Sequence, residues 1–361
     1  MSDQIGDRLQ ALVDKTGRDP DLAGLVVRIE RQDDGFAWTG SVGELDPTTR
    51  FFIASTTKLY TTAIMLRLAE RRSLGLEDRL VDHGGTEWVQ GLHVMEGIDY
   101  TDRITLRQLL AHTSGLPDYF LGKRQGAPSL EKSIRSGVDS TWTLEDVVDM
   151  ARELGPVFPP GTPGKARYAD TNFQLLGRVI EHVTGLTFAN ALRAEILEPL
   201  RLEHTWLYTD PADIRPLSLR DRSRQLHIPM AMASFGPDGG LVTPVGDLMR
   251  FLRGFFEGGL FDPAVLDTLK TYNRIFFPLQ YGVGFARLKL PRALSPFAAQ
   301  PELLGHSGLS GAFAFLAPEQ GIYLAGTVNN IAKPGRSFRL MLRLLQALGT
   351  HQTESRLGIR P

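Results

Sequence analysis

Strand-like segments lie at both ends of the chain, and this arrangement restricts the fold more than any other feature of the sequence. Near the start, AGLVVRIE (23–30) and GFAWTGSVG (35–43) are short, β-branched and aromatic, and Asp33-Asp34-Gly35 supplies a turn between them. Near the end, three segments have the same character: YGVGFARLKL (281–290), GAFAFLAP (311–318) and GIYLAGTVNN (321–330). We therefore expect an α/β lobe that is built from both termini.

Helical patterns fill the rest of the chain. The N-terminus and Ser337–Ala347 are amphipathic, and a long helical pattern runs from Ser55 to about Arg72. Helix starts are expected at Thr105 before LRQLLAH, at Thr143 with a capping-box pattern, and at Thr243 before PVGDLMRFLRGFFEGG. Two further helices are expected at 171–185, ending at Gly185, and in the segment TFANALRAEIL that follows. We predict that residues 1–75 and 240–361 form the α/β lobe and that residues 76–239 form an inserted, mainly helical lobe. A functional site is expected where the two lobes meet.

The composition excludes several classes of function. The 361 residues contain no cysteine, which removes disulfides, thiolate metal sites and cysteine nucleophiles. Forty lysine and arginine residues nearly balance 41 acidic residues, so nothing favours a nucleic acid or an anionic membrane as partner. The eight histidines are scattered and no H-E-x-x-H occurs, so we expect no metal and no other cofactor.

We expect that the residues at the N-terminus do not act as a targeting segment. Asp3, Gln4, Asp7 and Arg8 interrupt any apolar stretch of the roughly 7–15 residues that a secretory signal needs. No window reaches the roughly 18 apolar residues of a membrane span. We expect a cytoplasmic protein that acts on a small molecule; the sequence leaves the oligomeric state open.

The first motif with catalytic chemistry is Ser55-Thr56-Thr57-Lys58. Residues three apart share a helix face, so the lysine lies one turn from the serine and is a candidate to activate its hydroxyl. A serine at a helix start also has backbone N–H groups that favour a developing oxyanion. Ser129-Leu130-Glu131-Lys132 has the same spacing but lies in a polar stretch, so we favour Ser55 as the nucleophile.

Two further motifs supply the remaining candidates. In Tyr168-Ala169-Asp170, the phenol is a candidate for proton transfer and the carboxylate for holding Lys58. In His306-Ser307-Gly308, a strand edge with small residues allows a substrate to lie alongside it. The N–H group of the next residue, Leu309, then forms an oxyanion hole with the N–H group of Ser55.

Together these motifs resemble the penicillin-recognising serine hydrolases, which include class C β-lactamases, serine D-alanyl-D-alanine carboxypeptidases and family VIII carboxylesterases. The resemblance extends from about Leu25 to Asn330 and includes several longer phrases: FFIASTTK, ITLRQLLAHTSGLPDY, PGTPGKARYADTNFQLLGRVIEHVTG, GGLVTPVGDLMRFL and GHSGLSGAFAFLAPEQGIYLAGTVN. It implies a β-lactamase/transpeptidase-like fold of the α+β type. An antiparallel five-stranded sheet would be flanked by the terminal helices, with an inserted all-helical lobe.

The resemblance also implies roles for single residues. Ser55 would form an acyl-enzyme, Lys58 and Tyr168 would share its proton, and Asp170 would support Lys58. His306, Ser307 and Gly308 would line the substrate site, and Tyr119, after HTSGLP, would contact substrate. The loop between about Phe120 and Trp142 is expected to shape the mouth of the pocket.

Two residues depart from the family pattern. Asp170 stands where asparagine is usual, and an anion there should raise the pKa of Lys58 and shift proton abstraction toward Tyr168. His306 stands where β-lactamases have lysine, and a mostly neutral imidazole holds a carboxylate less firmly. We therefore favour an esterase-like hydrolase of esters, amides or β-lactams. A D-alanyl-D-alanine carboxypeptidase or D-aminopeptidase-like enzyme and a non-catalytic, penicillin-binding acylated sensor are the alternatives.

Overall fold

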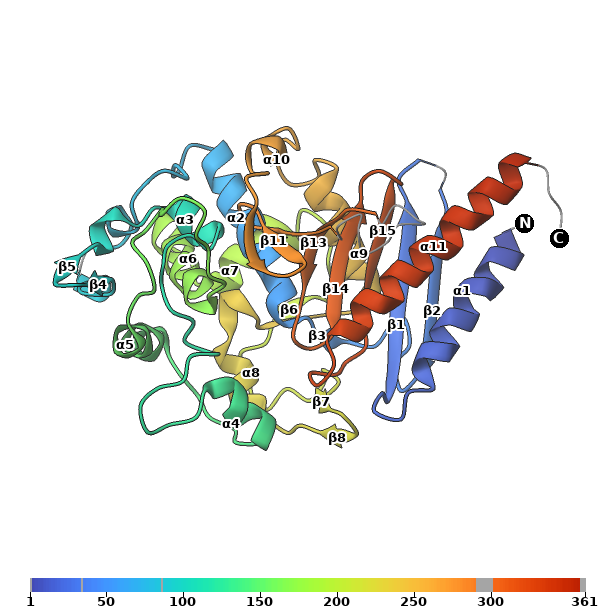
Figure 1. Cartoon of the computed structure of the whole chain (residues 1–361), viewed down its shortest axis with the longest axis horizontal. Helices are drawn as coiled ribbons and strands as arrows, with labels where there is room; N and C mark the ends of the chain where they lie inside the picture. Colours follow the sequence, from blue (N-terminus) through green and yellow to red (C-terminus); the bar gives the residue numbers. More distant parts are fainter. Residues whose placement is uncertain (1, 34, 86, 290–300, 358–361) are drawn as a thin grey trace.

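One large antiparallel sheet carries the fold, in a computed structural model that describes residues 2–33, 35–85, 87–289 and 301–357 (Figure 1). Its strands, in spatial order, are β10 (Asn273–Phe276), β11 (Leu279–Tyr281), β12 (Ala286–Leu288), β13 (Leu303–Ser307), β14 (Ala312–Ala317), β15 (Ile322–Thr327), β1 (Gly24–Arg31) and β2 (Ala37–Gly43). Strand β1 pairs with β15, with Val26 opposite Thr327. The prediction that both termini build one sheet is confirmed.

The expected five strands were too few, because the described residues place eight in this sheet. The segment 281–290 was predicted as one strand. It contains instead the end of β11, a turn at 282–285 and all of β12, with Gly284 at φ +88°. Leu290 lies outside the described residues, as does Asp34 in the predicted turn before β2.

The sheet has two covered faces because its side chains alternate in direction. Along β14, Phe313 and Phe315 pack on the same side as the terminal helices α1 (Ser2–Gly17) and α11 (Gly335–Leu357). Ala312 and Ala314 face the opposite side, toward the core that includes α2 (Thr57–Glu70) and α9 (Val245–Phe256). The terminal helices flank the sheet as predicted, and they lie side by side in Figure 1.

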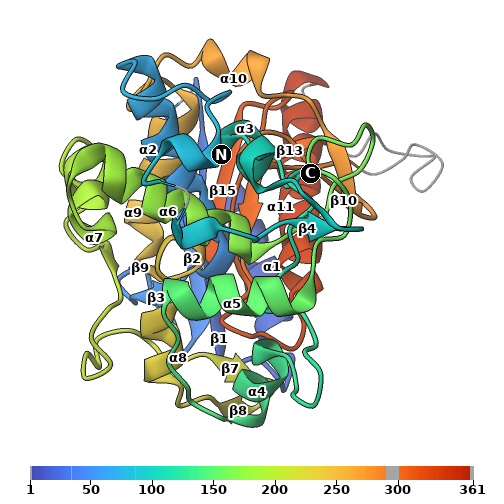
Figure 2. The same ribbon diagram turned by 90° about the vertical axis from the view of Figure 1, so that its left-hand side faces the viewer.

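The segment between β2 and β10 contains most of the helices, which face the viewer in Figure 2. Besides α2 and α9 these are α3 (Leu106–Leu110), α4 (Leu130–Ser136), α5 (Leu144–Leu154), α6 (Asp170–Thr184), α7 (Phe188–Leu192), α8 (Pro229–Ser234) and α10 (Val265–Thr268). The expectation of an all-helical lobe was wrong. Short strands occur as well: β4 (Val94–Met95) with β5 (Ile98–Asp99), β7 (Arg220–Asp221) with β8 (Arg224–Gln225), and β6 (Trp206–Leu207). The hairpin turns reverse at left-handed residues, Gly97 and Arg222. The lobe boundaries at 76–239 stay a prediction.

Most helix boundaries follow the predicted signals. Thr143 caps α5 in a capping box with Asp146, and Gly185 ends α6 at φ +67°. Thr243 does not start α9, because it belongs to strand β9 (Leu241–Thr243) and Pro244 occupies the cap position. Within the described residues, no helix has both the length and the hydropathy required to cross a bilayer.

Candidate active site

Ser55 lies in a tight turn that the surrounding strands hold in place. Strand β3 (Phe51–Phe52) pairs with β9, and the turn η1 (Ala54–Thr56) follows directly, leading into α2. Ala54 has φ +45°, a left-handed conformation that is unfavourable for a residue with a Cβ atom. Such strain persists only where the surroundings impose it, and it presents Ser55 at the start of α2.

Lys58 is completely buried one turn after Ser55. Its Nζ donates hydrogen bonds to Ser55 Oγ at 3.2 Å and to the carbonyl oxygen of Asp238 at 2.7 Å. It also forms an ion pair with Asp170 Oδ1 at 2.6 Å. Burial alone lowers the pKa of Lys58, but the charges of Asp170 and Asp238 outweigh it and the net pKa is raised. Asp170 therefore raises the pKa of Lys58, as the sequence predicted, and the resting lysine is an ammonium.

Tyr168 approaches the same two residues from the loop before α6. Lys58 Nζ lies 5.2 Å from the centre of the Tyr168 ring. Burial raises the pKa of Tyr168 well above its usual value, and Asp170 raises it further, while a hydrogen bond with Ser55 lowers it in part. The phenol is therefore neutral at pH 7. The structure thus brings Ser55, Lys58, Tyr168 and Asp170 together, although two separate segments of the chain supply them.

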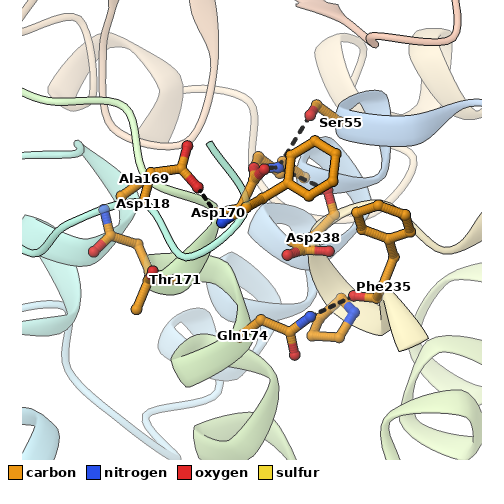
Figure 3. A network of polar contacts seen from close by, with 12 residues as sticks. Ser55, Asp118, Ala169, Asp170, Thr171, Gln174, Phe235 and Asp238 are labelled. Atoms are coloured by element: carbon orange, nitrogen blue, oxygen red, sulfur yellow. Dashed lines mark hydrogen bonds and ion pairs between the residues drawn. The ribbon is translucent and has the colours of Figure 1, made fainter. Parts of the chain in front are cut away.

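Two further buried carboxyl groups, which the sequence did not single out, surround this centre (Figure 3). Asp238, in η6 (Gly236–Asp238), accepts a hydrogen bond from the Tyr119 hydroxyl at 2.8 Å. Burial and the charge of Asp170 raise the pKa of Asp238 well above its usual range. The same two causes raise the pKa of Asp118 to about 7. The ion pair between Lys58 and Asp170 therefore lies beside two carboxyl groups that keep their protons to higher pH than an ordinary aspartate.

The backbone amides predicted to form the oxyanion hole belong to Ser55 and Leu309, and both residues line the pocket. Among the backbone hydrogen bonds of the described residues, neither amide donates to an acceptor. Gly308 makes the approach of the two segments possible, because a Cβ atom there would lie 2.2 Å from the Ile53 carbonyl oxygen. The glycine of the third motif is thus explained by close packing of β13 on the turn that carries Ser55.

His306 lies behind the reacting groups rather than in the pocket wall, since its side chain is buried and does not line the pocket. Its Nδ1 is 2.7 Å from the Ser307 carbonyl oxygen, and its Nε2 is 3.0 Å from the Tyr281 hydroxyl. Burial and the charge of Lys58 lower the pKa of His306 to about 3. The ring is therefore neutral, with Nδ1–H donating to the carbonyl and Nε2 accepting from Tyr281. A direct contact between His306 or Ser307 and substrate stays a prediction.

Tyr119 was expected to contact substrate, but its side chain is buried and its hydroxyl is used by Asp238. The next residue, Phe120, lines the pocket instead. The pocket encloses about 520 Å³, its open mouth included, and is mainly apolar. Its apolar walls are formed by Phe120, Ile134, Leu219, Ile228, Met232, Phe235, Leu309 and Ile331. Three residues of the predicted loop, Glu131, Ile134 and Arg135, also line it.

A second buried network, which sequence reasoning missed, holds the loop that carries Tyr168. His112 Nδ1 accepts a hydrogen bond from the Ala169 amide at 3.2 Å and lies 3.0 Å from Asn172 Nδ2. The His112 and Tyr168 rings pack with their centres 4.4 Å apart. The signal was present in the HTSG phrase, but nothing in its spacing assigns His112 a partner 57 residues away.

Ser129, the serine of the second S-x-x-K pattern, has a purely structural role. It caps α4, and its Oγ accepts a hydrogen bond from the Lys132 amide. Across residues 2–33, 35–85, 87–289 and 301–357, no three histidine or acidic side chains gather in a way that could hold a metal ion.

Comparison with known proteins places this geometry in a family. The family model for Beta-lactamase matches residues 9–348. The chain belongs to the Beta-lactamase family. It is 27% identical, over 326 residues, to penicillin-binding protein 4* of Bacillus subtilis, an alignment that covers 83% of this chain and 66% of the relative. The chain spans two thirds or less of the length of the curated relatives it matches.

Solved structures of similar proteins share the Beta-lactamase-family fold over nearly the whole chain. A D-stereospecific amidohydrolase from Streptomyces sp. has a TM-score of 0.73 at 25% identity, covering 92% of this chain and 97% of the other. EstCE1, a hydrolase with promiscuous acyltransferase activity, has a TM-score of 0.75 at 22% identity, covering 96% and 98%. The predicted β-lactamase/transpeptidase-like fold is confirmed.

Proposed function

We propose that the protein is a serine hydrolase that transfers an acyl group to Ser55 Oγ and then to water. The observation that carries the proposal is the position of one serine hydroxyl. It accepts a hydrogen bond from Lys58, whose ammonium also lies over the Tyr168 ring, and Ser55 lines an apolar pocket together with Leu309. Nucleophile, proton carrier and oxyanion donors are the parts that acyl transfer requires.

In the proposed acylation step, Tyr168 relays a proton rather than acting as a stored phenolate. The resting Tyr168 is neutral and Lys58 is charged, so neither is a ready base. The Ser55 oxygen bonds to the acyl carbon as its proton passes to the Tyr168 oxygen. The bond between the acyl carbon and the leaving group then breaks, and the phenol proton passes to the departing group. The Lys58 ammonium stabilises the negative charge that develops on Ser55 Oγ during the transfer. The same relay, run in reverse with water, releases the acid.

The pocket supports an esterase-like activity on small molecules with an apolar acyl group. Its walls are mainly apolar. His306 provides no permanent cation for a substrate carboxylate, because its neutral ring lies behind Tyr281. The charge of Arg135, in the pocket wall, is shared with Glu131 and Asp221. These features favour esters over β-lactams, whereas the amidohydrolase and penicillin-binding relatives keep amides and D-alanyl peptides as the alternative substrates. A small molecule remains the proposed partner, and a cytoplasmic location remains a prediction from the sequence.

Turnover of p-nitrophenyl butyrate tests the proposal. We expect repeated product release, a transient mass increase on Ser55 in intact-mass analysis, and complete loss of both in Ser55→Ala. Tyr168→Phe should lower kcat by more than a hundredfold, because the relay is lost. Full activity in Ser55→Ala contradicts the proposal. A single stoichiometric burst without turnover identifies the acylated sensor instead, and a loss under tenfold in Tyr168→Phe removes Tyr168 from proton transfer.

A further inference from the structure

A basic groove lies on the side of the sheet opposite the active site, between the end of α1 and the start of α11. It is lined by six cationic side chains, one aspartate and two further residues: Lys15, Arg18, Lys333, Arg336, Arg339, Arg343, Asp19, Thr16 and Leu340. The chain as a whole has a net charge of −1, so this concentration of positive charge is local. The groove encloses about 1030 Å³, its open side included.

Four of these cations have no partner in the described part of the chain. Lys333 and Arg336 are matched by acids: Lys333 pairs with Asp21, and Arg336 pairs with Asp19 and lies 3.6 Å from Asp21. The remaining four are exposed and form no ion pair or hydrogen bond through their side chains: Lys15, Arg18, Arg339 and Arg343. Unmatched cations that face one groove repel one another, and this repulsion is relieved when an anion binds.

Arg336 adds an independent indication of a ligand. Its side chain is only 9% exposed, and its Nη1 atom has no hydrogen-bond partner in the described residues. A buried donor left without an acceptor costs about 1–3 kcal/mol, so such groups normally have one. Nη1 is shielded from solvent, and the Arg336 side chain that carries it belongs to the lining of the groove. Arg336 also lies in the first turn of α11, where the backbone N–H groups favour negative charge.

The spacing of the arginines selects among anions. Arg336, Arg339 and Arg343 follow one another at intervals of three and four residues and therefore share one face of α11. They extend over about 10 Å of helix. A single phosphate or carboxylate contacts one or two of them, whereas a chain of linked phosphates contacts all three in sequence. Guanidinium groups suit phosphate oxygens because they donate two parallel hydrogen bonds.

We propose that this groove binds a small molecule that carries several linked phosphate groups, such as a nucleoside triphosphate or an inorganic polyphosphate. A membrane surface presents the same phosphate chemistry, but a flat layer of headgroups does not reach a guanidinium that is 9% exposed between two helices. The site is separate from the Ser55 pocket and shares no lining residue with it. The proposal therefore does not depend on the hydrolase activity.

Calorimetric titration of the full chain with inorganic tripolyphosphate tests this proposal. We expect saturable binding that is at least tenfold tighter than that of orthophosphate and that weakens as salt is added. Arg339→Gln/Arg343→Gln should weaken tripolyphosphate binding at least tenfold and leave ester hydrolysis within twofold. Both side chains are exposed and unpaired, so the variant should fold. Arg178→Gln/Arg193→Gln removes the same charge from other exposed positions and should change binding less than twofold.

Three outcomes would overturn the proposal. One is the absence of tripolyphosphate binding to the wild-type chain at millimolar concentration. Another is an equal loss of binding in the two double variants, which would show an effect of net charge only. The third is sedimentation with phosphatidylglycerol vesicles that depends on Arg339 and Arg343 while tripolyphosphate does not bind, which would assign the groove to a membrane surface.

Discussion

Replacing Asp170 by asparagine tests how the active-site lysine is kept charged. The Asp170 carboxylate lies 2.6 Å from Lys58 Nζ, and both side chains are buried. Removing one partner of a buried ion pair costs about 3–5 kcal/mol, because the other charge is left without compensation. Alternatively, Lys58 releases its proton and is buried as a neutral amine. At pH 7 that release costs about 4.6 kcal/mol, since an unfolded lysine has a pKa of about 10.4 and each pH unit is worth about 1.36 kcal/mol.

These numbers predict a loss in the free energy of unfolding of about 3–4.6 kcal/mol at pH 7. The loss should shrink to no more than about 1.9 kcal/mol at pH 9, where releasing the proton is cheaper. The sign follows from the pKa of Lys58. In the wild type it is raised, so the lysine is protonated in both folded and unfolded states over this range. In the variant burial lowers it, so only the unfolded state binds the proton and stability rises with pH.

Denaturant unfolding at pH 7 and pH 9, in wild-type and Asp238→Asn backgrounds, measures the effect. The second background is needed because Asp238, which lies beside the same lysine, could ionise and replace the lost charge. The explanation fails if, in the Asp238→Asn background, Asp170→Asn costs less than about 1 kcal/mol at pH 7. It also fails if the loss there is as large at pH 9 as at pH 7.

Three further perturbations follow from the same site. Asp238→Asn should stabilise the protein more at pH 8 than at pH 5 in denaturant unfolding, because the raised pKa of Asp238 makes its carboxyl cost stability as pH rises; an equal effect at both values would contradict this. Because the pKa of about 3 keeps the folded His306 ring neutral, the wild-type free energy of unfolding should fall by up to about 1.4 kcal/mol per pH unit below pH 6.5. His306→Gln should remove this contribution, and an unchanged dependence of stability on acid pH would refute the explanation. Gly308→Ala should lower kcat for p-nitrophenyl butyrate about a hundredfold, because its Cβ atom displaces the oxyanion amides. The matched change Gly246→Ala, in open space on α9, should leave kcat unaltered, and equal kcat values in the two variants would disprove the packing argument.

The sequence predicted the parts of the site that depend on local spacing. Ser55 and Lys58 share a helix face whatever the rest of the fold does, and the Thr143 capping box determines its own helix start. Alternation of apolar side chains was sufficient to identify the paired strands at both termini. The segment 281–290 misled the prediction because a turn with Gly284 divides an apolar run that has no polar interruption.

The parts that were missed depend on contacts between distant segments. Asp238 holds Lys58 through a backbone carbonyl oxygen, a group that every residue has, so its side chain gave no signal. Phe120 rather than Tyr119 lines the pocket, because the Tyr119 hydroxyl donates a hydrogen bond to the buried Asp238. Asp238 is 119 residues away along the chain, so local sequence gives no sign of this contact. His306 packs near Tyr168 without lining the pocket, and only its tertiary neighbour Tyr281 shows which nitrogen carries the proton.

The pairing of β1 with β15 has a consequence for how the protein is made. On the ribosome, the first hairpin emerges some 300 residues before the strand that will cover its inner edge, since Val26 lies opposite Thr327. At about 5–20 residues per second, that edge waits for at least about 15 seconds. Throughout that interval an apolar strand with unpaired backbone groups is open to other nascent chains. We therefore expect a chaperone that shields the β1 edge until β15 has emerged to raise the yield of folded protein.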